Sequence, residues 1–139
     1  MRPRRLSGAS ARPLNFTVRR QMGLLAWLRR ERQWRREHMA AFSAAGQRQV
    51  DGLTLFQHQA IFRVAPFTRA DCFKRITMDD HSGVYLVASL GTRGAELYIY
   101  PNEAAIFGAK PHSWFEEWDY RTPADLLEAL AKECASRGA

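Results

Sequence analysis

The stretch that decides the fold is Glu96–Tyr120, ELYIYPNEAAIFGAKPHSWFEEWDY. β-branched and aromatic residues make up most of ELYIY and half of AAIF, and the PNE segment between them has the composition of a turn. A second loop, at KP, precedes Ser113–Tyr120, which is typical of a further strand. Connections this short join antiparallel neighbours. The stretch therefore predicts three consecutive strands of one antiparallel sheet.

The sequence before this stretch adds strands to the predicted sheet. Cys72–Met78 alternates in side-chain character, and DDHSG at 79–83 is a turn. Val84–Leu90, VYLVASL, is apolar on both parities, which predicts a central strand covered on both faces. The GTRG segment then turns the chain into ELYIY.

One segment, Leu53–Val64, fits two periodicities. With a period of two, LTLFQHQAIFRV is a strand whose alternate residues, from Phe56 through His58 to Val64, share one face. With a helical period, Phe56, Ala60 and Val64 lie on one side of a helix. We expect the strand and keep the helix as the alternative. The sheet then has about five to six strands.

Helical patterns flank this sheet. From Phe16 to about Ala45 apolar residues recur at helical spacing, and Gly46 suits the C-terminal stop. After the sheet, Thr122 is a typical N-cap and Pro123 suits the first helical position. A long N-terminal helix, an antiparallel meander sheet and a short C-terminal helix predict an α+β fold for a single domain, residues 16–139.

The positive charge is concentrated in the N-terminal third. Residues 1–48 contain twelve Arg and two acidic residues, whereas residues 49–139 contain nine Lys or Arg and twelve acidic residues. Residues 1–15 have almost no large apolar side chains and are predicted to be a disordered basic tail. An upstream extension before Met22, an organellar leader, and an arm for nucleic acid or anionic lipid are alternative interpretations.

The composition favours a cytoplasmic protein without a membrane span. Charged residues make up 25% of the 139, and no apolar run approaches the roughly 18 residues that a bilayer requires. The two cysteines, Cys72 and Cys134, form no CxxC pair and are expected to be reduced thiols. Cytoplasmic localisation is therefore the expectation.

No strong catalytic or metal-binding signature is present in the sequence. The four histidines are scattered, without HxH or HxxxH spacing, so neither a metal nor a cofactor is predicted. Asp79-Asp80-His81 lies in a predicted turn, where these residue types are favoured for backbone reasons. We therefore expect a non-enzymatic protein. A small hydrolase that uses Cys72 or the Asp79–His81 turn is the alternative.

Two surfaces are candidates for binding a macromolecule. Aromatic anchors among carboxylates suit a basic protein partner. The predicted protein-binding residues are Trp114, Glu116, Glu117, Trp118 and Asp119, all in the predicted last strand. The alternative is nucleic-acid binding through a basic face of the long helix, formed by Arg29, Arg32 and Arg36.

Within residues 84–136, the strand ELYIY, the turn PNE, the aromatic-acidic strand WFEEWDY and the helix TPADLLEAL follow one another. In this order of elements the chain resembles small α+β bacterial immunity proteins of polymorphic-toxin and contact-dependent inhibition systems. The resemblance implies a non-enzymatic cytosolic inhibitor that blocks a partner toxin, and it implies no catalytic residues. The basic N-terminal third departs from the acidic character of inhibitors of nuclease toxins. The oligomeric state does not follow from the sequence.

Overall fold

The computed structural model describes residues 23–68, 73–92, 94–108 and 112–138. The described elements, in chain order, are α2 (Leu24–Ala45), α3 (Leu55–Val64), η1 (Ala65–Phe67), β1 (Lys74–Thr77), β2 (Val84–Leu90), β3 (Ala95–Ile99), β4 (Ala104–Phe107), β5 (Ser113–Phe115), η3 (Glu117–Asp119) and α4 (Pro123–Gly138). The predicted α+β class, with a long first helix, an antiparallel sheet and a short last helix, is confirmed.

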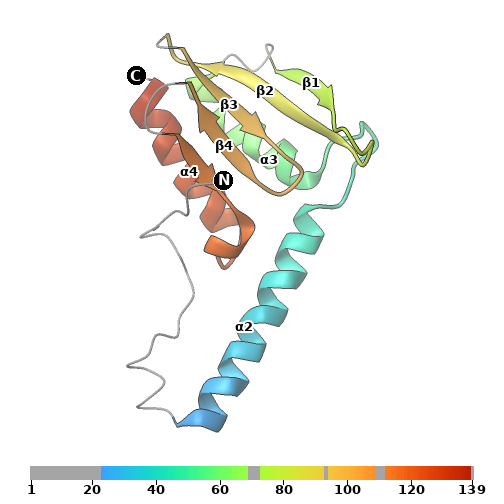
Figure 1. Ribbon diagram of the computed structural model, residues 1–139, viewed down its shortest axis with the longest axis vertical. Coiled ribbons are helices and arrows are strands. Elements are labelled where there is room, and N and C mark those ends of the chain that lie inside the picture. The colour runs from blue at the N-terminus through green and yellow to red at the C-terminus, as the bar shows by residue number, and fades with distance from the viewer. Residues whose placement is uncertain (1–22, 69–72, 93, 109–111, 139) are drawn as a thin grey trace.

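Five strands form one antiparallel sheet in the order β1-β2-β3-β4-β5. Each strand pairs with the next along the chain, as at Leu86 opposite Ile99 and at Tyr98 opposite Ala105. α3 and α4 lie against one face of the sheet, whereas α2 extends away from this body as a long arm (Figure 1). The described helices therefore leave the other face of the sheet uncovered.

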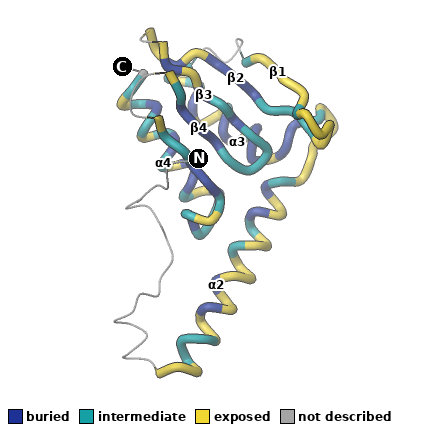
Figure 2. The backbone as a smooth tube through the Cα atoms, viewed as in Figure 1, coloured by how far each residue is buried: buried dark blue, intermediate teal, exposed yellow. Residues whose placement is uncertain are grey.

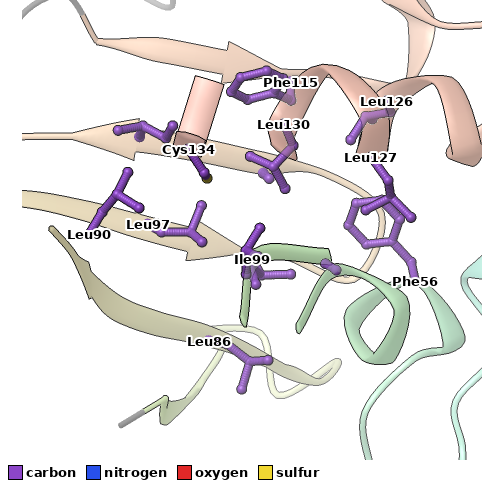
Figure 3. Packing of buried hydrophobic residues seen from close by; sticks show 14 of the residues in the cluster. Phe56, Leu86, Leu90, Leu97, Ile99, Phe115, Leu126, Leu127, Leu130 and Cys134 are labelled. Atoms are coloured by element: carbon purple, nitrogen blue, oxygen red, sulfur yellow. The ribbon is translucent and has the colours of Figure 1, made fainter. Parts of the chain in front are cut away.

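The hydrophobic core fills the space between the sheet and the helices α3 and α4. Because side chains alternate along a strand, Leu86 and Leu90 of β2 and Leu97 and Ile99 of β3 share the covered face. Figure 3 shows Leu97 and Ile99 near Leu130 and Cys134 of α4, which belong to the same core cluster. α4 contributes a buried stripe that consists of Leu126, Leu127, Leu130 and Cys134. The buried backbone segments accordingly gather in the sheet and the two helices behind it (Figure 2).

The segment Leu53–Val64 forms a helix, and the expected strand is wrong. A capping box decides the conformation. The Thr54 hydroxyl accepts a hydrogen bond from the Gln57 backbone N–H at 3.1 Å, and the Gln57 side chain accepts one from the Thr54 N–H at 2.9 Å. The helical alternative, with Phe56 and Val64 buried on one side, is therefore correct. The T-x-x-Q pattern of this capping box is present in the sequence, and it favours the helical period over the period of two.

Gln57 also links α3 to the sheet through hydrogen bonds. Its side-chain amide donates to the carbonyl oxygen of Val84 at 2.8 Å and to that of Ile99 at 3.3 Å, at the adjacent ends of β2 and β3. Thr54 Oγ1 donates to the Pro101 carbonyl at 2.8 Å. Gln57 is only 1% exposed, so water cannot replace a partner that is lost here.

The second half of α2 is joined to the body by Phe42 and Ala45, which are buried in the core cluster, and by polar contacts. The ring of His38 stacks on Trp34 with centroids 5.0 Å apart, and His38 Nδ1–H donates to the Tyr120 carbonyl at 2.9 Å. The adjacent residue, Glu37, forms an ion pair with Arg121. These contacts account for a histidine within the apolar stripe of the helix. No helix in the described ranges is both long and apolar enough to cross a membrane.

The predicted last strand, Ser113–Tyr120, is wrong in its second half. β5 ends at Phe115, and the chain then forms the 3-10 turn η3. Within this turn the Asp119 N–H donates to the Glu116 carbonyl at 3.1 Å. Neither parity of the segment is wholly apolar, so a continued strand would carry carboxylates toward the core. The 3-10 turn instead leaves Glu117 and Asp119, which share the parity of the buried Phe115, half-buried.

The other element boundaries follow the sequence signals closely. α4 begins as predicted, because Thr122 Oγ1 accepts a hydrogen bond from the Asp125 N–H at 3.2 Å. Gly46 follows the last residue of α2, as expected. β1 is shorter than the predicted strand Cys72–Met78. Cys72 itself, and the predicted helix start at Phe16, lie outside the described residues.

Candidate functional site

Aromatic side chains occupy the face of the sheet that α3 and α4 leave uncovered. They come from four adjacent strands and the residues that flank them. The set, here called the aromatic face, consists of Tyr85 on β2, Tyr98 on β3, Tyr100 after β3, Phe107 on β4, His112 before β5 and Trp114 on β5. His112 is exposed and the other five side chains are half-buried.

The rings of the aromatic face contact one another from strand to strand. Ring centroids are 6.1 Å apart for Tyr85 and Tyr98, 5.1 Å for Tyr98 and Phe107, and 4.9 Å for Phe107 and Trp114. Tyr100 lies 5.4 Å from Tyr85 and 6.4 Å from Tyr98. Phe107 is nearly perpendicular to Tyr98 and to Trp114, the edge-to-face geometry that aromatic pairs favour. The contacts hold the rings as one continuous surface.

Strand alternation separates this face from the core. In β3, Leu97 and Ile99 are buried toward the helices, so Tyr98 between them must point the other way. Val87 and Ala105 lie opposite Tyr98 on the neighbouring strands and are themselves buried. Small and branched side chains therefore lie buried beneath and between the rings of the aromatic face.

Little charge is present on the aromatic face. Glu96 of β3 is paired in register with Phe107 and is exposed, with no ion-pair partner in the described ranges. Lys74, on the edge strand β1, lies in register with Val87 at the far side of the face. Burial, and next the negative charge of Glu96, raise the pKa of Tyr98. The Tyr98 hydroxyl thus stays neutral and can donate a hydrogen bond at physiological pH.

The structure separates the five predicted protein-binding residues. Trp114 belongs to the aromatic face, whereas Glu116 is buried, with 3% of its surface exposed. Trp118 projects from η3 and is 51% exposed, while Glu117 and Asp119 beside it are half-buried. The acidic strand that the sequence predicted is thus divided into one aromatic-face residue, one buried carboxylate and one exposed turn.

The predicted basic face of the long helix is present on α2. Arg29, Arg32 and Arg36 are exposed, and together with Gln33 and Glu37 they line an open depression of about 460 Å³. None of the three arginines has an ion-pair partner among the residues described. Their spacing places them on the side of α2 opposite Trp34.

Other polar candidates are accounted for by local structure. The Asp80 carboxylate accepts hydrogen bonds from the Ser82 N–H at 3.0 Å and the Ser82 hydroxyl at 2.6 Å, which lower the pKa of Asp80 and close the predicted turn. His58 Nε2 lies 2.9 Å from Asp51 Oδ2, a pair that the sequence analysis missed. In the described ranges, no three His, Cys, Asp or Glu side chains are grouped as a metal site would require.

A second exposed aromatic side chain lies in the helical layer. Phe62 of α3 is 82% exposed and borders a shallow groove of about 320 Å³ between α3 and α4. Leu127 and Arg63 also line this groove. Phe62 lies on the helical side of the sheet, away from the aromatic face, so its replacement is a matched control for the loss of an exposed ring.

Sequence reasoning missed most of the aromatic face. It identified Trp114 but treated ELYIY and AAIF only as strands of the sheet. The available signal was parity, because Tyr98 and Tyr100 alternate with the apolar pair Leu97 and Ile99. What parity could not show is that no described helix covers the tyrosines.

The comparisons with known proteins give no name to this site. No family model, no curated protein and no solved structure matches the chain.

Proposed function

We propose that this protein is a non-enzymatic protein-binding module whose contact surface is the aromatic face. The observation that carries the proposal is the continuous row of rings from Tyr85 to Trp114 on a sheet face without a described helix over it. A soluble protein rarely leaves a contiguous apolar patch of this kind without a use for it. Tyrosine and tryptophan are also the side chains most often found as binding anchors.

The finer proposal is that the partner is a toxin and that the module is an immunity-type inhibitor in the cytoplasm. Such a protein acts by covering its target, so it needs a rigid surface and no catalytic group. The ring contacts across β2 to β5 provide a surface that loses little side-chain entropy on binding. Trp118, which is exposed on the turn after β5, can extend this contact.

The test is affinity capture from the native host, followed by titration with the captured protein. The double variant Tyr98→Thr with Trp114→Thr keeps β-favouring residues on the strands and removes two rings. We expect binding to weaken by about 30-fold for each ring that acts as an anchor. The circular dichroism spectrum should remain that of the wild type, because both side chains lie outside the core.

The matched control is Phe62→Ser, which also removes an exposed ring but from the helical layer. It should bind the captured protein as the wild type does. Equal binding by the double variant and the wild type would contradict the proposal. A toxin-like reading frame beside the gene would support the finer proposal of an inhibitor.

The second candidate function is nucleic-acid binding through α2. It is favoured by the three exposed arginines, Arg29, Arg32 and Arg36, around one open depression. Neutralising all three to Gln should lower the slope of log affinity against log salt concentration by about 2 to 3, because each phosphate contact releases a counterion. The measurement is binding to DNA and RNA over a salt series, with Arg63→Gln as the control. An unchanged slope would exclude this face.

A further inference from the structure

The aromatic face combines two features that together select a ligand group. The first is a set of neighbouring rings with electron-rich faces, Tyr98, Phe107 and Trp114. The second is the exposed carboxylate of Glu96, which is paired in register with Phe107 and has no ion-pair partner in the described part of the chain. We infer that the aromatic face binds an arginine-bearing segment of its protein partner. This inference rests on the proposed function, which it deepens.

The charges of the described residues on this face favour a cationic partner over an anionic one. Within the described strands, two charged side chains share this face: Glu96 lies among the rings, whereas Lys74 lies on β1, separated from Tyr98 by β2. A phosphate backbone would meet the Glu96 carboxylate, with no ion-paired cation on that carboxylate among the described residues to offset the repulsion. A positively charged side chain would meet both the carboxylate and the negative faces of the rings.

Arginine fits this arrangement better than lysine. The guanidinium is flat and weakly hydrated, so it can stack on one ring while its N–H groups remain available to a carboxylate. Phe107 is perpendicular to both Tyr98 and Trp114, so rings of two orientations border the position of Glu96. The neutral hydroxyl of Tyr98 adds a hydrogen-bonding group to the same surface.

The experiment uses a short blocked peptide of alternating arginine and glycine as the probe. Two matched peptides carry citrulline, which has nearly the same shape without the charge, or lysine. Binding to the full chain is followed by anisotropy of the labelled peptide and by the aromatic resonances of the protein. We expect the arginine peptide to bind most tightly, the lysine peptide less tightly and the citrulline peptide least, with shifts of the Tyr98 and Trp114 signals.

Variants then locate the contact. Tyr98→Leu and Trp114→Leu should each lower the affinity for the arginine peptide by about threefold to fivefold, because they keep apolar bulk and remove the ring. Glu96→Gln should lower the affinity for the arginine peptide by about twofold to fivefold at low salt and should make the binding less dependent on salt. Phe62→Leu should leave the affinity unchanged.

Three results would overturn the inference. Equal affinity for the citrulline peptide would show that charge does not matter. Tighter binding of a single-stranded oligonucleotide to the same rings would make the face a platform for bases. If a captured partner still depends on Trp114 while the arginine peptide leaves the rings undisturbed, protein binding stands and arginine recognition fails.

Discussion

Replacing Gln57 by Leu should lower the free energy of unfolding by about 3 kcal/mol. The substitution leaves the carbonyls of Val84 and Ile99 and the N–H of Thr54 without the partner they have now. The Gln57 side chain that bonds to these three backbone groups is only 1% exposed. Water therefore has little access to replace the lost hydrogen bonds. Urea unfolding followed by circular dichroism measures the change, with the slope of the transition kept constant.

Gln59→Leu provides the control for the Gln57 result. Gln59 lies on the same helix with its side chain exposed, so the same chemical change should alter the stability by less than about 0.5 kcal/mol. If Gln57→Leu were as stable as Gln59→Leu, the capping box and the link from α3 to the sheet would be wrong.

Raising the pH above about 9 should destabilise the fold through Cys134. This side chain of α4 is fully buried, and burial, with the negative charge of Glu133 as a smaller cause, raises its pKa to about 12. The unfolded thiol ionises near its usual value of 9.0 while the folded thiol keeps its proton. The stabilisation is therefore complete below pH 9 and falls by about 1.4 kcal/mol for each unit as the pH rises toward 12.

The measurement for Cys134 compares two proteins that both carry Cys72→Ser, one with Cys134 and one with Cys134→Ala. Subtracting their free energies of unfolding at each pH removes the contribution of lysines, tyrosines and arginines. We expect the difference to shrink steadily above pH 9. A difference independent of pH would mean that the thiol ionises in the folded state, and native Cys134 would then also react readily with thiol reagents.

The parts of the fold that the sequence predicted are those with a local chemical signal. Thr122 and Pro123 begin α4, Gly46 follows the end of α2, and strong β-formers mark β2 to β4. In Leu53–Val64 two local signals conflicted, and the prediction was based on the weaker of them. The period of two in LTLFQHQAIFRV suggested a strand, yet one capping box stabilises the helix that the chain adopts.

The candidate site was harder to predict because its members come from four strands. Trp114 was identified from the aromatic density of its own segment. Its neighbours Tyr98 and Phe107 become part of the same surface only through the register of β3, β4 and β5. Glu116 shows the opposite failure, because a carboxylate expected on the surface is buried at the end of β5. Only tertiary packing decides which side chains are covered.

The central claim is that the aromatic face is where a protein partner binds. The most direct test is a chemical-shift map of the isotope-labelled protein, recorded with and without the captured partner. We expect the largest changes at Tyr85, Tyr98, Phe107 and Trp114, with the signals of Phe62 unchanged. Changes confined to α2 or to the groove beside Phe62, with the four rings unaffected, would contradict the claim.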